Sequence, residues 1–327
     1  MKPIIDAINA SQRPLILQAE NPDGDSLASA LALEAILGDL GKSPSMFCSV
    51  AIPKYLRYLP GWDRVNDVLP TDFDLSIVVD ASSSSLFERA FNEHLPEFKK
   101  HQFIVIDHHS DKVDLPLETL NLIDDSAVST GQVVAQLSKN ADWPLSAGAA
   151  DMIASSILSD SLGLTSPKTT AVSIRLLADM VEAGADLSRL DEARRELNKK
   201  TDDIFRYKGR LFERVELLLD GRLAIVTIPW EEIEAYSDAY NPSMLIIDEM
   251  RQIEGVAVAA AFKTYPDGKI TVKLRANPEA RFMDRLAEHF GGGGHPFAAG
   301  FKLHDMPLDT LKKEFTVQVK QLLEQAE

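Results

Sequence analysis

Residues 103–109 constrain the fold of this chain most, because the apolar run Phe-Ile-Val-Ile is followed at once by Asp107, His108 and His109. A short run of β-forming residues is typical of a fully buried strand. In an open α/β sheet, ligands bind in the crevice outside the carboxyl ends of the strands. The stretch therefore predicts a strand that carries a carboxylate and two imidazoles to such a crevice. The alternative is a strand cap beside a solvated histidine, and the motif alone leaves both open.

Two other segments repeat this arrangement of a strand followed by acidic residues. Residues 13–18 indicate a strand that is followed by Asp23 and Asp25, and residues 74–80 indicate a strand that ends in Asp80. Helical patterns occupy residues 26–40, 129–137, 147–157, 170–183 and 187–198. Strands that alternate with helices predict an α/β fold with a mostly parallel sheet flanked by helices.

The pattern changes near residue 200. Residues 201–219 indicate a long charged helix, and strands are expected at 222–228, 253–262 and 269–274, the last two joined by the turn Tyr-Pro-Asp-Gly at 265–268. Helices are expected at 281–290 and 308–325. We therefore predict an N-terminal domain over 1–198, a linking helix over 199–219 and a smaller α/β C-terminal domain over 220–327.

The composition argues against several classes of protein. A net charge of −16 argues against a broad basic track for long nucleic acid, whose binding needs many Lys and Arg contacts to phosphates. It leaves room for a small phosphorylated ligand. No run of about 18 apolar residues occurs, so no membrane span is expected. The one cysteine, Cys48, excludes an intrachain disulfide and fits a reducing, cytoplasmic location.

Acidic residues follow ordered segments at four points of the N-terminal domain. They are Asp23 with Asp25, then Asp80, Asp107, and Asp160 after the apolar residues 152–158. Such residues often cap helices, and Asp25 is a candidate N-cap. If instead they converge with one histidine, they suit Mn²⁺ or Mg²⁺. Two such ions about 3.5–4 Å apart can activate a water and stabilise an in-line displacement at phosphorus.

In order and spacing, these segments resemble the four motifs of the DHH phosphoesterases. The matching residues are Asn21-Pro22-Asp23-Gly24-Asp25-Ser26, Asp80, Asp107-His108-His109 and Leu158-Ser159-Asp160-Ser161. Residues 291–300 resemble the glycine-rich signature of the C-terminal domain associated with that family, and Leu274-Arg275 resembles the strand that precedes it. The resemblance covers essentially the whole chain and is closest to the nanoRNase and 3′-phosphoadenosine-5′-phosphate phosphatase branch.

This resemblance implies a metal centre. Asp80 would bridge two ions, Asp25, His108 and Asp160 would complete one site, and Asp23 would belong to the other. The cofactor would be one or two Mn²⁺ ions, with Mg²⁺ as an alternative. Hydrolysis would follow attack by a metal-activated water, in a cleft between the domains.

The resemblance also implies two catalytic residues. Asp107 would orient His108 by accepting its other ring N–H. His109 would face the scissile phosphate as a proton donor or electrostatic stabiliser. The N-terminal domain would thus be the catalytic one.

The chain departs from the family pattern at four positions. Ala19 stands for His, Ser83 for Asp, Leu86 for Arg and Lys112 for Asn. Gln18 or Glu20 could replace the missing imidazole, although strand alternation points Glu20 away from the face that Ala19 occupies. Either one metal binds weakly, which leaves a slower or differently specific enzyme, or the chain has lost catalysis and keeps only binding.

The glycine run suggests a substrate-binding function for the C-terminal domain. Without Cβ atoms, Gly292, Gly293 and Gly294 allow backbone N–H groups to approach a phosphate or a base closely. Arg275 and His295 could add charge-assisted contacts to a terminal phosphate. A flexible loop is the alternative for four glycines alone.

The expected function is metal-dependent hydrolysis of short oligonucleotides, of nucleotide 3′-phosphates, or of both. A catalytically silent nucleotide sensor is one alternative, and a hydrolase of cyclic-dinucleotide products or polyphosphate is another. The sequence leaves open the exact substrate, the cleavage polarity and the oligomeric state, for which a homodimer is one option.

Overall fold

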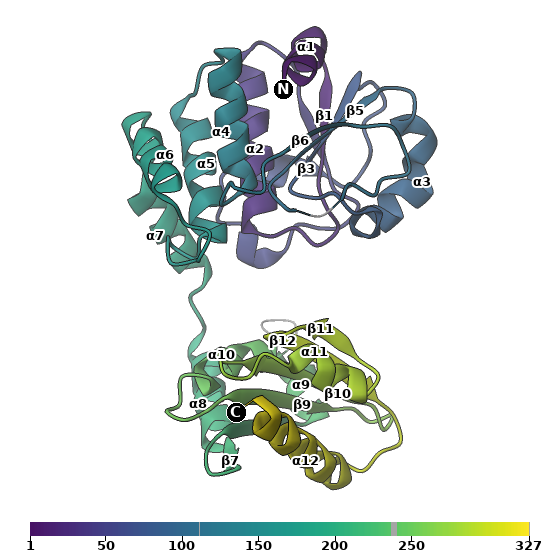
Figure 1. Ribbon diagram of the computed structural model, residues 1–327, viewed down its shortest axis with the longest axis vertical. Helices are drawn as coiled ribbons and strands as arrows, with labels where there is room; N and C mark the ends of the chain where they lie inside the picture. The colour runs from purple at the N-terminus through teal and green to yellow at the C-terminus, as the bar shows by residue number, and fades with distance from the viewer. Residues whose placement is uncertain (111, 237–240, 327) are drawn as a thin grey trace. The chain divides into compact units, whose positions relative to one another are not determined.

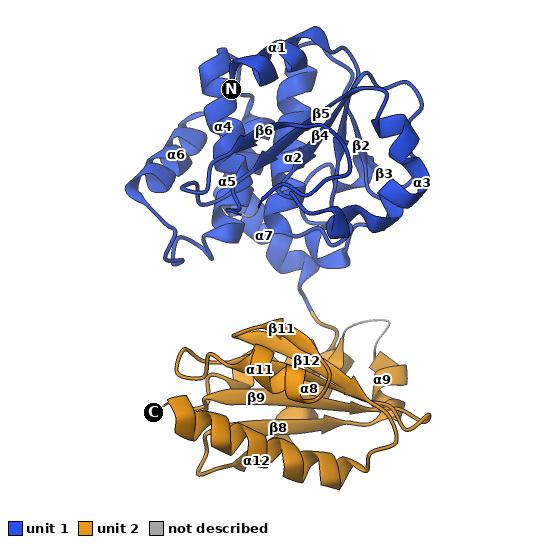
Figure 2. Cartoon of the chain, turned by 45° about the vertical axis from the view of Figure 1, so that its right-hand side comes forward, with its two compact units in different colours: residues 1–199 blue, residues 200–327 orange. Residues whose placement is uncertain are grey.

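The computed structural model describes residues 1–110, 112–236 and 241–326, which divide into units of residues 1–199 and 200–327 (Figure 2). Each unit has its own six-stranded sheet and its own apolar core. None of the helices in the described part of the chain combines the length and the hydropathy of a membrane span.

The first unit is built on a parallel sheet, as predicted. In spatial order its strands are β3 (Val65–Asn66), β2 (Ser45–Phe47), β1 (Pro14–Leu17), β4 (Leu75–Val79), β5 (Gln102–Asp107) and β6 (Leu120–Ile123). All neighbours pair in parallel. The strand order reverses between β1 and β4, and in open α/β sheets ligands bind at such a switch point.

Helices cover both faces of this sheet. They are α1 (Lys2–Ala10), α2 (Gly24–Asp39), α3 (Glu88–Phe98), α4 (Thr130–Ala141), α5 (Ala147–Asp160), α6 (Ala171–Glu182) and α7 (Leu187–Leu197). Because successive strand residues point to opposite faces, Ile16 packs into the core that contains α2, α4 and α5, whereas Leu15 packs with α3. Figure 1 shows α2, α4 and α5 as neighbours, with α3 apart from them.

The second unit has a mixed sheet. In spatial order its strands are β11 (Gly293–His295), β12 (Ala298–Leu303), β10 (Ile270–Ala276), β9 (Val258–Thr264), β8 (Leu223–Ile228) and β7 (Glu216–Leu218). Strands β8 and β9 are parallel and the other pairs are antiparallel, including the predicted hairpin of β9 and β10. Its helices are α8 (Asp202–Glu213), α9 (Trp230–Tyr236), α10 (Ile247–Met250), α11 (Met283–His289) and α12 (Leu308–Ala326).

The expected linking helix over 199–219 is wrong in its extent. Helix α8 ends at Glu213 and is followed by strand β7. Its residues Ile204, Tyr207 and Leu211 have the 3–4 residue spacing of one helix face and are buried in the core of the second unit. The segment therefore belongs to the second unit.

Candidate metal centre and active site

The acidic residues of the first unit meet near the carboxyl ends of β1, β4 and β5. Asp107 is the last residue of β5, Asp80 follows β4, and Asp25 lies in the first turn of α2. Asp160 is the last residue of α5. Asp80 has φ of 61°, a left-handed conformation that is uncommon for residues other than glycine and that Asp and Asn tolerate best.

His108 faces three of these carboxylates. Its Nε2 atom lies 3.5 Å from Asp25 Oδ2, 3.5 Å from Asp80 Oδ1 and 3.2 Å from Asp160 Oδ2. The imidazole is buried, and Nε2 has no hydrogen-bond partner within the part of the chain that the structure describes. Two ligands about 2.1 Å from one ion and at right angles to each other are about 3 Å apart. The spacing therefore suits ligands that share one small cation.

The contact made by the other ring nitrogen of His108 determines whether Nε2 acts as a hydrogen-bond donor or as a metal ligand. Nδ1 lies 3.3 Å from the carbonyl oxygen of Ala127. A carbonyl only accepts hydrogen bonds, so Nδ1 carries the proton and Nε2 of the neutral ring presents a lone pair. A lone pair that faces three carboxylates is repelled unless a cation lies between them. These residues therefore fit a divalent ion such as Mn²⁺ or Mg²⁺.

The buried carboxylates also repel one another. Burial, and then repulsion from Asp160, raises the pKa of Asp25 to about 6. Burial, and then repulsion from Asp25, raises the pKa of Asp80 well above its ordinary value. A cation would lower both pKa values, because an opposite charge favours the ionised form.

The expected hydrogen bond from the His108 ring to Asp107 is wrong. Asp107 Oδ1 accepts from His109 Nδ1 at 2.8 Å and from the backbone N–H groups of His108 and His109. Burial alone would raise the pKa of Asp107, but the bonds from His109 hold it below its ordinary value. The bond to Asp107 in turn raises the pKa of the half-buried His109. Asp107 therefore orients His109, because the turn after β5 aims the His108 ring at Ala127 instead.

Asp23 and Asp25 have different local environments. Asp23 is exposed and is the N-cap of α2, where its Oδ1 accepts from the backbone N–H groups of Asp25 and Ser26 at 3.0 Å. The alternative prediction that Asp25 is the N-cap of this helix is therefore wrong. Within the described residues, acidic and histidine ligand atoms gather within 4.8 Å of one another in two sets, Asp25-His108-Asp160 and Asp80-Asp107-His108-His109. Asp23 is in neither set.

The glycine run of the second unit forms an edge strand rather than an irregular loop. Gly293–His295 is β11, which pairs with β12. A Cβ atom on Gly292 would lie 2.2 Å from the carbonyl oxygen of Gly300, and one on Gly294 would lie 2.5 Å from Ala299 Cα. Both positions therefore require glycine for packing. A Cβ atom on Gly293 would meet nothing within 4 Å.

The predicted substrate-binding side chains lie on neighbouring strands. Arg275 on β10 pairs with Ala298 on β12, which pairs with His295 on β11. Cross-strand partners share a face of the sheet, so Arg275 and His295 lie on one face with only the small Ala298 between them. The same register places Lys273 and Gly293 on this face.

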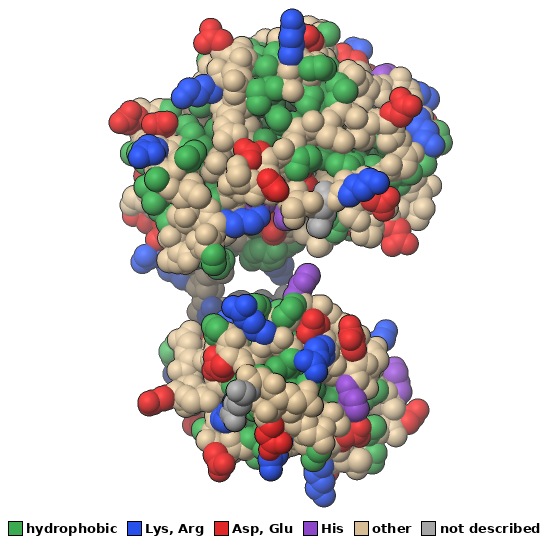
Figure 3. Space-filling model, viewed as in Figure 1, with side chains coloured by type: hydrophobic (Ala, Val, Ile, Leu, Met, Phe, Trp, Pro, Cys, Tyr) green, Lys and Arg blue, Asp and Glu red, His purple; other side chains and the backbone are tan. Residues whose placement is uncertain are grey.

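Lys263 on β9 extends this set to a row of three cations with Lys273 and Arg275. Lys263 pairs with Thr271, which alternation places on the same face as Lys273. Burial, and then repulsion from Lys273, lowers the pKa of Lys263, and burial followed by repulsion from Arg275 lowers that of Lys273. A bound anion would relieve this repulsion. On the face seen in Figure 3, Lys and Arg side chains lie scattered among acidic and apolar ones.

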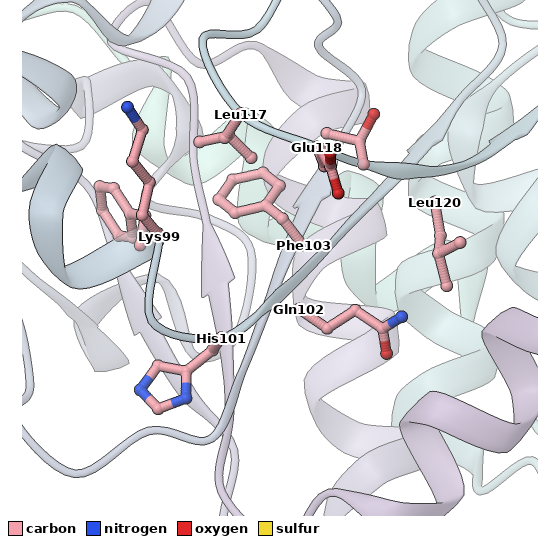
Figure 4. Close-up of a pocket in the computed structure, with 9 residues that line it drawn as sticks. Lys99, His101, Gln102, Phe103, Leu117, Glu118 and Leu120 are labelled. Carbon is pink, nitrogen blue, oxygen red and sulfur yellow. The ribbon is translucent and has the colours of Figure 1, made fainter.

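A hollow of about 640 Å³ lies at the other end of the parallel sheet, at the start of β5 and β6. Lys99, His101, Gln102, Leu117 and Glu118 are among the residues that surround it (Figure 4). None of the predicted site residues lines it, and it lies at the amino ends of the strands. We therefore place the candidate site at the carboxyl ends.

Comparison with known proteins agrees with this geometry. Residues 14–157 match the DHH family, N-terminal domain, and residues 233–325 match the DHHA1 domain. The chain belongs to the DHH family. This confirms the resemblance inferred from the motifs.

Two curated relatives of this DHH chain have the same name, bifunctional oligoribonuclease and PAP phosphatase NrnA. The Thermus thermophilus protein is 26% identical over 331 residues, which span 100% of this chain and 95% of the relative. The Bacillus subtilis protein is 25% identical over 304 residues, 90% of this chain and 92% of the relative. An exopolyphosphatase-related protein from Bacteroides fragilis shares the fold, with a TM-score of 0.80, 20% identity and coverage of 99% and 98% of the two chains.

Ala19, where the DHH motif is expected to have His, offers no ligand atom and lies buried among apolar side chains. Glu20 Oε1 accepts from the backbone N–H groups of Arg89 and Ala90 at the start of α3, so Glu20 is engaged elsewhere. The amide nitrogen of the buried Gln18 donates to Ser26, and its Oε1 atom has no partner among the described residues.

The other three departures lie in the chain that surrounds the DHH site. Ser83 pairs with Asp114 through a parallel β-bridge. Leu86 packs against the aromatic-rich core around α3, and Lys112 is exposed. Leu86 thus contributes apolar packing where the family pattern has a cation.

Residues outside the DHH motifs also contact the predicted ligands, and Thr130 and Ser156 are two of them. Thr130, at the start of α4, donates to both Asp25 and Asp80, and Ser156 on α5 donates to Asp25. The sequence analysis missed both. The one available signal was Ser-Thr-Gly at 129–131, which is typical of a helix start.

Helices α2 and α5 approach each other closely beside the DHH site. A Cβ atom on Gly24 would lie 2.2 Å from Ser159 Oγ. Gly24 precedes the ligand Asp25 and Ser159 precedes Asp160. The lack of a side chain at residue 24 therefore allows these two carboxylates to approach the same point.

Proposed function

We propose that this chain is a metal-dependent phosphoesterase that hydrolyses short oligonucleotides and nucleotide 3′-phosphates. The observation that carries the proposal is the position of His108 Nε2, which faces the carboxylates of Asp25, Asp80 and Asp160. The names of the two NrnA relatives support the two substrate classes.

The ion would be held by Asp25, Asp80, His108 and Asp160, with Mn²⁺ as the expected metal and Mg²⁺ as the alternative. When bound, such an ion polarises a phosphoryl oxygen and makes an attacking water more acidic. The four side chains supply three oxygens and one imidazole nitrogen, which is a donor set suited to these metals.

His109 is the proposed proton donor. Its Nδ1 atom is engaged by Asp107, which leaves Nε2 on the other side of a half-exposed ring. Because Asp107 raises the pKa of His109, the ring stays protonated to higher pH than an isolated histidine. Nε2 can then donate a proton to a phosphate or leaving-group oxygen, with Asp107 stabilising the charged ring.

The second unit is proposed to bind the end of the substrate away from the scissile bond. Lys263, Lys273 and Arg275 form a cation row whose mutual repulsion a phosphate would relieve. His295 shares their face, and Gly293 leaves its backbone open on the neighbouring edge strand. Charge-assisted hydrogen bonds of this kind favour a terminal phosphate.

Because Ala19 stands where the second metal site is expected to have a histidine, we expect the protein to bind only one ion tightly in the absence of substrate. The remaining acid of the other site, Asp23, already caps α2, and Glu20 is engaged with α3. Equilibrium dialysis with Mn²⁺ should give one tight equivalent per chain, and Asp23→Asn should leave it unchanged. Two tight equivalents in the wild type would contradict this expectation.

The direct test is hydrolysis by metal-stripped protein to which Mn²⁺ is returned. Oligonucleotides of about two to five residues and 3′-phosphoadenosine 5′-phosphate are the substrates. Turnover should require Mn²⁺ and be abolished by His108→Ala, while His101→Ala at the opposite end of the sheet serves as the matched control. Absence of turnover of both substrates by folded wild type with Mn²⁺ would refute the proposal.

The same experiment separates the enzyme from a silent nucleotide sensor. Calorimetric binding of Mn²⁺ and nucleotide without hydrolysis would favour the sensor, and recovery of activity by Ala19→His would strengthen that interpretation. A cytoplasmic location and a homodimeric assembly stay predictions from the sequence.

A further inference from the structure

Thr130 holds two of the proposed metal ligands at once. Its backbone N–H donates to Asp25 Oδ2 at 2.8 Å, and its hydroxyl donates to Asp80 Oδ1 at 2.9 Å. These two oxygens are the ones that lie 3.5 Å from His108 Nε2. One residue therefore fixes the ion-facing oxygen of both carboxylates relative to a single backbone position.

Ser156 fixes the other oxygen of Asp25. Its hydroxyl donates to Asp25 Oδ1 and also lies 2.9 Å from Ser129 Oγ. A hydroxyl has one proton, and a charged carboxylate is the stronger acceptor, so the Ser156 proton is directed to Asp25 rather than to Ser129. Ser156 in addition accepts from the backbone N–H of Gly131 at 2.8 Å. The same N–H lies 3.4 Å from Asp25 Oδ1, so Gly131 and Ser156 both direct a donor toward the Asp25 carboxylate.

This arrangement is buried and complementary in charge. Ser129, Thr130 and Ser156 are all 0% exposed. The N-terminus of a 12-residue helix such as α4 carries a partial positive charge, which favours an ionised carboxylate nearby. Water cannot replace these donors easily at such depth. The two carboxylates are therefore held in one orientation before any ion arrives.

We propose that Thr130 and Ser156 are positioning residues that preset Asp25 and Asp80 for a divalent ion. The inference rests on the proposed metal centre and adds to it the residues that determine its affinity. Neither side chain needs to touch the substrate. Partners that orient metal ligands typically change metal affinity by about 10–100-fold when they are removed.

The test measures Mn²⁺ binding by calorimetry on metal-stripped full-length protein, without substrate. Thr130→Val removes the hydroxyl and keeps the shape and the backbone N–H, and Thr130→Ser keeps both donors. Thr170→Val is the matched control, because Thr170 caps α6 with its hydroxyl in the same unit. We expect the Mn²⁺ dissociation constant to rise roughly 10–100-fold for Thr130→Val and to stay near the wild-type value for Thr130→Ser and Thr170→Val.

A second readout separates positioning from a general folding defect. Hydrolysis by Thr130→Val should return toward the wild-type kcat when Mn²⁺ is raised, with the substrate KM unchanged. Ser156→Ala should weaken Mn²⁺ binding in the same direction, and it replaces Thr130→Val if that variant does not fold. Wild-type Mn²⁺ affinity in folded Thr130→Val or Ser156→Ala would overturn the inference. Absence of Mn²⁺ binding by the wild type would instead overturn the proposed metal centre.

Discussion

At Asp25, the proposed metal binding and the stability of the metal-free protein place opposite demands on one carboxyl group. Without metal, burial and then repulsion from Asp160 raise its pKa from 3.8 to about 6. A raised carboxyl pKa means that the folded state binds a proton more readily than the unfolded chain, so stability decreases as the pH rises from about 4 to about 6. A shift of about 2 pKa units corresponds to about 3 kcal/mol. The ionised carboxylate should therefore destabilise the metal-free protein by about this amount near neutral pH.

Asp25→Asn removes this charge. The amide of the new side chain has only one oxygen, so it can accept from Thr130 or from Ser156 on one atom only, whereas the carboxylate accepts on two. One of these hydrogen bonds is therefore lost, at a cost of about 1 kcal/mol. We expect the metal-free variant to be more stable than wild type by roughly 1–2 kcal/mol at about pH 7.5. It should also have lost its tight Mn²⁺ binding.

The assay is urea unfolding in EDTA, with both proteins carrying Trp230→Phe so that the fluorescence of Trp62 and Trp143 reports on the first unit. At about pH 5 the folded wild type keeps the Asp25 proton while the unfolded chain has largely lost it, so roughly half of the 3 kcal/mol remains. After the cost of the lost hydrogen bond, the stabilisation should shrink to roughly 0–1 kcal/mol. Asp74→Asn is the contrasting control. Burial of Asp74 is outweighed by hydrogen bonds from Ser11 and two backbone amides, which hold its pKa below the ordinary value. Its replacement should therefore destabilise the protein at about pH 7.5.

The result that would refute this reasoning is a metal-free Asp25→Asn protein that is less stable than wild type at both pH values. A stability gain that does not change with pH would also refute it, because the gain would then have a source other than ionisation.

Mn²⁺ at about 100 times its dissociation constant should stabilise the folded wild type by about 2.7 kcal/mol, which would be measured as a rise in Tm. The Tm of His108→Ala should not rise, and an equal rise in this variant would contradict the proposed ligand set. Asp107→Asn replaces the charged acceptor that raises the pKa of His109 with a neutral one, so His109 should lose its proton at lower pH and the alkaline loss of activity should move to lower pH. An unchanged pH–rate profile would count against His109 as the donor. Arg275→Ala should raise the substrate KM by roughly 10–100-fold with a smaller effect on kcat, with the more peripheral Arg281→Ala as the control. Equal effects of both arginine variants would argue against a specific phosphate contact.

Strands β1, β4 and β5 of the first unit could be predicted because they are short, apolar and followed by acidic residues, whereas β3 and β6 were not predicted. Burial on both faces, which residues 103–106 show, is typical of a strand in a parallel sheet covered by helices, and the carboxyl end of such a strand determines where Asp107 lies. The position of Asp80 at the carboxyl end of β4 could be predicted in the same way. The parallel direction of the strands determines at which edge of the sheet these side chains lie, and the hydrophobic pattern of the sequence is enough to predict that direction.

What could not be predicted depends on contacts between distant segments. The partner of Asp107 is decided by how the chain turns after β5, and the contacts of Thr130 depend on the position of α4. Helix α3 was missed because Pro96 and charged residues obscure its buried positions Phe91 and Phe98. Tertiary packing, rather than local preference, selects these features.

Gly24 on α2 and Ser159 on α5 stand one residue before Asp25 and Asp160, and a Cβ atom at residue 24 would lie 2.2 Å from Ser159 Oγ. Rotation of the Ser159 hydroxyl would relieve only part of this clash, because Ser159 Cβ lies 3.0 Å from the same position. We therefore expect a methyl group added at residue 24 to press the two helices apart and to widen the gap between the two carboxylates that follow.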